Sequence, residues 1–251
     1  MNSENKLMGK MLNTNIRMFK IRLLEKKWLT QDIMKILFSA PGDFSFKAGQ
    51  FINVHIVRGE EKKYKAYSIL NPPSGKKGII ELGVKIIPGG FASEKFLEAK
   101  EGDEFLVKGP FGHFTFNEEV HGKEICFIAT GIGIAPFYGI LNEHLSSTKK
   151  NICLLFGVKT RKDLLFHEEF LEMEEKYTHF EYKPVLSREK WDERTGRVQE
   201  HLGKCYKCGL DEEFEKKTYY ICGQKEMVLE TKELLLSKGT KQENIKVERF
   251  S

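Results

Sequence analysis

The chain has 251 residues, of which 40% are hydrophobic and 31% charged, so it is long enough to bury one large core or two of ordinary size. No apolar run reaches the roughly 18 residues that a membrane-spanning helix needs, and the N-terminus lacks the continuous apolar segment of a signal peptide. The net charge of +5 comes from 41 basic and 36 acidic residues scattered along the chain. This balance argues against nucleic-acid binding and suits a basic face for an acidic protein partner.

The five cysteines do not form the pattern of a secreted disulfide framework, because their number is odd and Cys126, Cys153 and Cys222 lie in strand-like apolar runs. Cys205 and Cys208 form a Cys-x-x-Cys pair, but a structural zinc or an iron–sulfur cluster normally takes four ligands. The chain has no second such pair and no plant-type ferredoxin cluster spacing. We therefore expect a cytoplasmic protein without a bound metal, and leave the role of the Cys205–Cys208 pair open.

The first half of the chain predicts a series of short strands. Residues 1–15 mix charged and apolar side chains and are expected to form a flexible tail. After them, runs rich in β-branched and aromatic residues alternate with turn signals, which is typical of an antiparallel barrel or sandwich. The expected strands are 16–24, 33–38, 51–57, 66–70, 79–87 and 104–107, and one helix is expected at 92–99.

The second half alternates strand-like and helical runs, which predicts a parallel sheet with crossover helices. The polar, turn-prone segment NEEVHG at 117–122 separates the two halves. We therefore predict an antiparallel β domain, a barrel or a sandwich, over 16–118 and an α/β parallel-sheet domain over 119–251. The expected strands of the second domain are 125–129, 152–156, 180–186, 219–222 and 245–250, and its expected helices are 136–145, 163–177, 198–202 and 225–238.

The first strand of the second domain ends in the loop Thr130-Gly131-Ile132-Gly133. Parallel sheets bind ligands at the carboxyl ends of their strands, and a glycine loop before a helix N-terminus suits an anion. Pro136 fits the first turn of that helix, where no N–H is needed. The alternative is an ordinary strand-to-helix turn.

Three further stretches are candidates for ligand contact. Cys222-Gly223 ends the fourth strand at the same sheet edge, although a small buried cysteine is the alternative. Tyr67-Ser68 offers a flat ring and a hydroxyl, with an ordinary alternating strand as the alternative. The stretch from Gly89 to Ser93 opens the helix of the first domain and makes a second anion site from backbone N–H groups and the helix dipole.

Six motifs occur in one order along residues 16–250: A-G-Q-F, Y-S, G-G-x-x-S, G-P-x-G-x-F, T-G-x-G-x-A-P and C-G-x-x-x-M. This order resembles the ferredoxin–NADP reductase superfamily of flavoproteins. The resemblance implies a barrel that binds FAD, an α/β domain that binds the pyridine nucleotide, and electron transfer between NADPH and ferredoxin or flavodoxin. The alternatives are an NADH-dependent reductase component of an oxygenase and a non-catalytic flavin-binding subunit of a larger complex.

The resemblance also implies roles for single residues on the FAD side. Tyr67 would stack on the isoalloxazine ring and Ser68 would lie near flavin N5. Lys65 stands where the family usually has an arginine paired with the FAD pyrophosphate; because lysine lacks the bidentate fork, this role would be shared with Lys85. Phe250 is a candidate for the opposite flavin face, or else a core aromatic. Gly90, Phe91, Ala92 and Ser93 would cradle the pyrophosphate.

On the nucleotide side, the resemblance places Thr130, Gly131 and Gly133 at the pyrophosphate, and Cys222 and Gly223 near nicotinamide C4. A dihydronicotinamide would deliver a hydride to flavin N5, with Tyr67, Ser68 and Cys222 as the catalytic set and no strong acid or base. The remaining basic residues bear on the choice of nucleotide. Ser187, Arg188 and Arg197 would grip a 2′-phosphate, which favours NADP over NAD, unless Glu189, Asp192 and Glu193 neutralise this loop.

Overall fold

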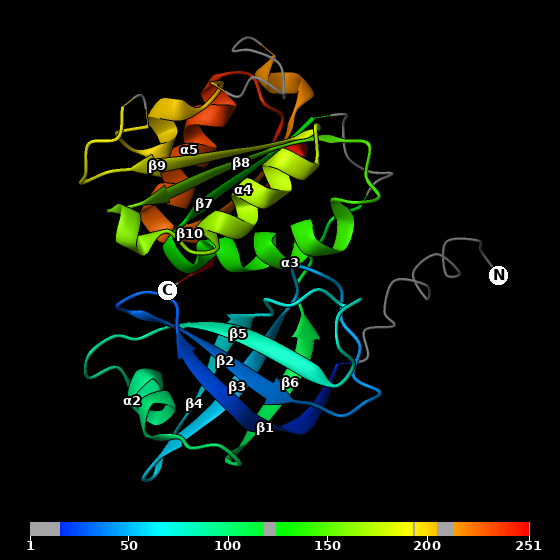
Figure 1. Ribbon diagram of the computed structural model, residues 1–251, viewed down its shortest axis with the longest axis vertical. Helices are drawn as coiled ribbons and strands as arrows, with labels where there is room; N and C mark the ends of the chain where they lie inside the picture. The colour runs from blue at the N-terminus through cyan, green and yellow to red at the C-terminus, as the bar shows by residue number, and fades with distance from the viewer. Residues whose placement is uncertain (1–15, 118–123, 193, 205–212, 251) are drawn as a thin grey trace, which may run out of the picture.

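The computed structural model describes residues 16–117, 124–192, 194–204 and 213–250 (Figure 1). The expected tail, the domain boundary proposed at 118/119, and Cys205 and Cys208 lie outside the described residues. The remaining positions form two sheets, one antiparallel and one parallel.

The first sheet is an antiparallel barrel with strand order β4-β3-β6-β1-β2-β5. It closes where Ile69, just after β4, bridges to Leu82 of β5, and where Leu70 N–H donates to Glu81 O at 2.8 Å. The predicted barrel is therefore confirmed. Its elements are β1 (Arg17–Trp28), β2 (Ile33–Ser39), β3 (Phe51–Arg58), β4 (Glu61–Ser68), β5 (Ile79–Lys85), α2 (Phe91–Glu98) and β6 (Glu104–Phe111).

Strand β4 differs most from its prediction, which placed a strand at 66–70. The strand begins at Glu61, and its first six residues are exposed. It pairs with β3 along its whole length, from Arg58↔Glu61 to Phe51↔Ser68. Because ladder hydrogen bonds rather than a buried face hold these residues in the sheet, the apolar pattern of the sequence does not reveal them.

The second sheet is parallel, with strand order β11-β10-β7-β8-β9. Alternate residues of β7 enter two different cores: Phe127 packs with α3 and α4 on one face, and Ile128 packs with α5 on the other (Figure 1). No described helix has the length and hydrophobicity of a membrane span. The elements are β7 (Glu124–Thr130), α3 (Ala135–His144), β8 (Asn151–Val158), α4 (His167–Lys176), β9 (Phe180–Leu186), β10 (Thr218–Gln224), α5 (Lys225–Ser237) and β11 (Ile245–Phe250).

Two helix predictions are shortened by local geometry. The run expected at 163–177 becomes a 3-10 turn, Arg161–Asp163, and then α4. Asp163 closes that turn by accepting bonds from the N–H and hydroxyl of Thr160, and Phe166 has a φ of 55° directly before α4. The helix expected at 198–202 is a 3-10 turn, Val198–His201.

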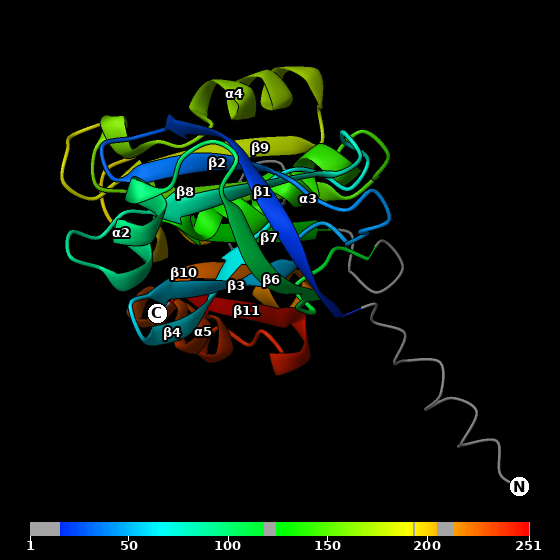
Figure 2. The same ribbon diagram turned by 90° about the horizontal axis from the view of Figure 1, so that it is seen from below.

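The barrel and the parallel sheet share packing. Ile33, Ala48 and Phe114 of the barrel chain belong to the same buried cluster as Phe137 of α3. The ring of Phe114 lies 5.5 Å from that of Phe137 and 5.1 Å from that of Tyr220 on β10. The end of β11 lies at this junction, beside the barrel (Figures 1 and 2).

Candidate active site

Tyr67 lies near the end of β4, half-buried against the barrel core. Its ring meets Phe96 of α2 edge-on, with centroids 5.5 Å apart and an interplanar angle of 86°. Burial raises the pKa of the Tyr67 phenol, so the ring stays neutral. A held, neutral aromatic ring is suited to stacking on another flat ring.

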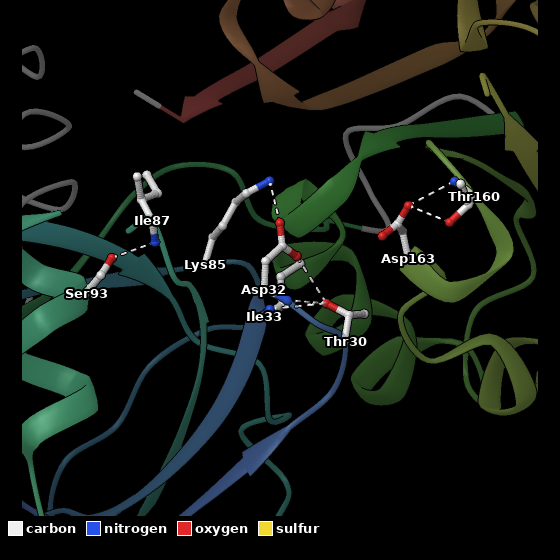
Figure 3. A network of polar contacts seen from close by, with 8 residues as sticks. All are labelled: Thr30, Asp32, Ile33, Lys85, Ile87, Ser93, Thr160 and Asp163. Carbon is white, nitrogen blue, oxygen red and sulfur yellow. Dashed lines mark hydrogen bonds and ion pairs between the residues drawn. The ribbon is translucent and has the colours of Figure 1, made fainter. Parts of the chain in front are cut away.

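The start of α2 brings the predicted residues Gly90 to Ser93 together. Gly90 is the N-cap, and the first N–H groups of a helix have no acceptor within the helix. Ser93 Oγ accepts the N–H of Ile87 at 2.9 Å (Figure 3), which holds the incoming turn against the helix. A Cβ at Gly90 would lie 2.9 Å from Ile87 O, so the turn has no room for a side chain there. These features fit a bound phosphate group.

Of the two lysines assigned to the FAD pyrophosphate, only one has a free charge. Lys85 pairs with Asp32 at 3.2 Å, and Asp32 also contacts Thr30 Oγ1 (Figure 3). Lys65 is exposed on β4 and pairs with no acidic side chain of the described residues. The charge of Lys65 is therefore available to a ligand, whereas that of Lys85 is partly offset.

The nucleotide loop forms as expected, with Pro136 in the first turn of α3. Gly131 has a φ of +53°, and a Cβ there would meet nothing within 4 Å, so its backbone faces open space. Gly133 packs tightly instead: its Cβ would lie 2.6 Å from the carbonyl carbon of Cys222. Thr130 Oγ1 is buried and, within the described residues, has no hydrogen-bond partner. An orphaned hydroxyl beside an open glycine backbone fits a bound nucleotide.

Three side chains from three strands meet at the domain junction. Ser68 Oγ of β4 donates to Glu248 Oε1 of β11 at 3.2 Å. Glu248 lies opposite Cys222 in the β10–β11 register. Ser68 is only 4% exposed and Cys222 is fully buried, so these two side chains are shielded from solvent. The structure thus brings together the predicted Ser68 and Cys222, through a carboxylate that was not predicted.

Glu248 is the site residue that the sequence analysis missed. Burial raises the pKa of its carboxyl to about 7, although the bond from Ser68 opposes the shift. Burial, and then the charge of Glu248, raise the pKa of the Cys222 thiol, so Cys222 stays protonated. The signal available in the sequence was a carboxylate two positions from Phe250, which alternation places on the same strand face.

Phe250 shares that half-buried face and packs against the core of the parallel sheet. It pairs with Gln224 in the β10–β11 register. Its assignment to the flavin stays a prediction.

The basic residues after β9 keep different amounts of free charge. Ser187 is anchored because its N–H and its hydroxyl both donate to Val158 O, and the backbone N–H of Arg188 donates to Lys159 O. The side chain of Arg188 is exposed and has no partner among the described residues. The carboxylate of Glu189 is taken by Arg161, at 3.1 Å. Arg197 is exposed and lies 3.7 Å from Glu230.

Both halves of the chain match models of known families. Residues 20–116 match the oxidoreductase FAD-binding domain, and residues 127–233 match the oxidoreductase NAD-binding domain. The chain belongs to the ferredoxin–NADP reductase superfamily. As a member of this superfamily, it is an FAD-dependent NAD(P)H oxidoreductase with the two-domain fold described above.

Individual members of the superfamily are similar over most of this chain. It is 29% identical to ferredoxin–NADP reductase B of Sorangium cellulosum over 240 residues, covering 92% of this chain and 97% of that protein. It is 29% identical to the reductase component of propane 2-monooxygenase from Rhodococcus jostii over 261 residues, covering 99% of this chain and 67% of that protein. The crystal structure of a Neisseria gonorrhoeae ferredoxin NADP+ reductase with bound FAD and NADP superposes with a TM-score of 0.81 at 25% identity, covering 92% and 98% of the two chains.

Proposed function

We propose that this superfamily member passes electrons between NADPH and a small acidic electron carrier of the ferredoxin or flavodoxin kind. The observation that carries the proposal is the bond from Ser68 Oγ to Glu248 Oε1, which joins the FAD side of the junction to the nucleotide side. Cys222 lies on the strand next to Glu248. A hydride donor held at Thr130 and Gly131 and a flavin held at Tyr67 would meet at this point.

Each residue has a separate task in this proposal. When bound, FAD exchanges a hydride for single electrons, which requires that a proton be taken up or released in the site. Tyr67 orients the flavin by stacking, and Ser68 offers its hydroxyl at the ring edge. Cys222 packs behind the nicotinamide and excludes water. Glu248 holds or releases the proton at Oε1, beside Ser68 Oγ, because its pKa of about 7 lets both forms exist at neutral pH.

The proposed preference for NADPH rests on Ser187, Arg188 and Arg197. Of the three carboxylates that could neutralise this loop, Glu189 is engaged by Arg161 rather than by Arg188, and Glu193 lies outside the described residues. A planar guanidinium suits a phosphate through paired, charge-assisted hydrogen bonds. Arg197 is the weaker of the two arginines for this role, since Glu230 offsets part of its charge.

An acidic carrier is favoured by the lysines of β4. Lys62, Lys63 and Lys65 are exposed on the strand that ends at Tyr67 and Ser68. Lys63 is paired with Glu61 at 2.8 Å, whereas Lys62 and Lys65 pair with no acidic side chain of the described residues. Such a basic edge next to the redox site steers an acidic partner to it. The Rhodococcus relative keeps a second acceptor open, an oxygenase component, and the cytoplasmic location stays a prediction from the cysteine pattern.

The test is anaerobic mixing of the FAD-loaded protein with NADPH or NADH, followed by reoxidation with ferredoxin or flavodoxin. We expect the flavin absorbance to bleach faster with NADPH and to return when the carrier is added. A protein that takes up no FAD would overturn the proposal. Bleaching followed by reoxidation with an oxygenase component alone would move the assignment to the second acceptor.

Arg188→Ala combined with Arg197→Ala tests the nucleotide preference. We expect KM for NADPH to rise roughly 30-fold while KM for NADH changes less than about threefold, because only NADPH carries the 2′-phosphate. Steady-state kinetics with both nucleotides measure this. Lys190→Ala, an exposed basic neighbour, is the matched control. Equal losses for the two nucleotides would contradict a 2′-phosphate site.

A further inference from the structure

The side chain of Lys26, on β1, ends at the C-terminus of α2. Its Nζ donates to Phe96 O at 3.0 Å, to Leu97 O at 2.9 Å and to Ala99 O at 2.6 Å. All three ammonium donors of Lys26 are therefore used on one turn of backbone. None of the site roles assigned above uses this residue.

Helix α2 depends on such contacts from outside the helix. It has only eight residues, and an isolated helix of that length is marginal in water. Its N-cap, Gly90, makes no side-chain capping bond, and its last carbonyls have no donors within the helix. Lys26 satisfies two of these carbonyls and that of the C-cap Ala99, and places a positive charge at the negative end of the helix dipole.

The same short helix serves the FAD site at two points. Its first turn holds Gly90 and Ser93, the proposed pyrophosphate cradle, and Phe96 in its second half touches the ring of Tyr67. A helix this short moves as one body, so an anchor at its C-terminus also sets the position of its N-terminus. We propose that Lys26 is a positioning residue for FAD, which keeps α2 formed and docked before the cofactor binds. This inference rests on the assignment of Gly90 to Ser93 to the pyrophosphate.

The expected consequence is a population effect. If α2 is formed only part of the time in the protein without FAD, the apparent Kd for FAD rises by the inverse of that fraction. Removing Lys26 should lower the fraction without removing any atom that touches the cofactor. FAD affinity should therefore fall, although every proposed FAD-contacting side chain is still present in the variant.

The experiment is calorimetric titration of FAD into the full-length protein freed of flavin, for wild type and Lys26→Met. We expect Kd to rise about tenfold, the effect of a partly buried cation lost from a helix C-terminus. Lys27→Met is the matched control, because Lys27 is the exposed neighbour on β1 and its side chain makes no hydrogen bond to a described residue. The Kd of this variant for FAD should stay within about twofold of the wild-type value. Lys26→Arg keeps charge and donors and should restore most of the affinity.

Hydrogen exchange separates positioning from general loss of stability. In Lys26→Met without FAD, the amides of residues 94–99 should exchange faster than in wild type, while those of β3 stay protected; added FAD should restore protection in α2. An unchanged Kd, or faster exchange over the whole barrel, would overturn the inference. If Lys26→Met does not fold, Lys26→Gln is judged by the same two measurements. Wild-type protein that binds no FAD would overturn the cofactor assignment itself.

Discussion

Glu248 is a carboxyl group on a strand face that it shares with Phe250, and its surroundings determine its chemistry. Its ordinary pKa near 4.5 rises to about 7 because burial disfavours the charged form, and the hydroxyl of Ser68 compensates for only part of this cost. Burial and the charge of Glu248 also raise the pKa of the neighbouring Cys222 thiol, which therefore stays protonated and unreactive. Of these two groups, Glu248 is therefore the one able to exchange a proton near pH 7.

Glu248→Gln keeps the shape of the side chain and removes its titration. We expect electron transfer to the one-electron carrier to slow roughly 100-fold, the usual contribution of a positioned acid or base. The wild-type rate should show an inflection near pH 7 that the variant lacks. Stopped-flow reoxidation across pH measures both quantities. Asp32→Asn, which breaks only the exposed pair with Lys85, should keep the inflection; an inflection that survives in Glu248→Gln would exclude this carboxyl as the proton carrier.

The same variant gives a stability signature. Because the pKa of Glu248 is raised in the folded state, its favourable contribution is complete below about pH 4.5 and is lost as pH rises through about 7. Relative to Glu248→Gln, the flavin-free wild type should lose up to roughly 3 kcal/mol of unfolding free energy over this range. Urea unfolding of both proteins at several pH values measures the difference. A difference that does not vary with pH would mean that the carboxyl is not desolvated.

The nucleotide loop shows how an element depends on close backbone approach. Gly133 lies in the 3-10 turn Gly131–Ile134, which links β7 to α3 and packs against the end of β10. A side chain at Gly133 would run into the backbone of Cys222 and Gly223, neither of which has a flexible end to move aside. The glycine is therefore needed for packing rather than for an unusual φ.

Gly133→Ala should push the turn away from β10. We expect a loss of about 1 to 3 kcal/mol in unfolding free energy, as for other overpacked sites, and a marked rise in KM for NADPH with FAD content unchanged. Chemical unfolding and steady-state kinetics measure these effects. Gly42→Ala serves as the control, because a Cβ there meets nothing within 4 Å. Normal nucleotide binding by Gly133→Ala would refute the close packing of this loop.

At the scale of the molecule, the two domains have to keep Ser68 and Glu248 within hydrogen-bonding distance. Part of this task falls to Phe114, which follows β6 and inserts between Phe137 and Tyr220 of the second domain. The hydroxyl of Tyr220 also donates to Thr115 O at 3.0 Å. Packing and hydrogen bonding thus tie the end of the barrel chain to the parallel sheet.

Phe114→Ala should cost about 3 to 5 kcal/mol of unfolding free energy, as for other buried phenylalanines, and should also slow hydride transfer in the folded protein. The affinity for FAD should change little, because all the proposed FAD residues except Phe250 lie on the barrel. Phe170→Ala is the matched control, because Phe170 is a buried residue of α4 in the core of the parallel sheet. This variant should lose a similar amount of unfolding free energy but transfer hydride at the wild-type rate. Thermal unfolding and single-turnover bleaching measure the two effects. Equal hydride-transfer rates in both variants would contradict a positioning role for the Phe114 contact.

Local patterns were sufficient for the plan of the molecule. The change from a strand-rich half to alternating strands and helices predicted an antiparallel barrel or sandwich followed by a parallel sheet, and the resemblance selected the barrel. The position of Pro136 and the glycines of the loop predicted the turn into α3. These features depend on the spacing of apolar, polar and turn-forming residues over short segments, which can be read from the sequence directly. Where tertiary pairing alone holds a segment, as in the exposed part of β4, the same patterns placed the strand too late.

The chemistry of the junction was decided by the tertiary structure. Ser68 and Glu248 are 180 positions apart and are polar residues without a motif between them. Only folding brings them together, and only burial turns Glu248 from an ordinary acid into one that titrates near pH 7. In the same way, Arg188 has no ion-pair partner among the described residues, because its neighbour Glu189 pairs with Arg161. The spacing of apolar residues is a local property that the sequence shows. The desolvation of a side chain and the choice of its ion-pair partner depend instead on which distant segments the fold packs together.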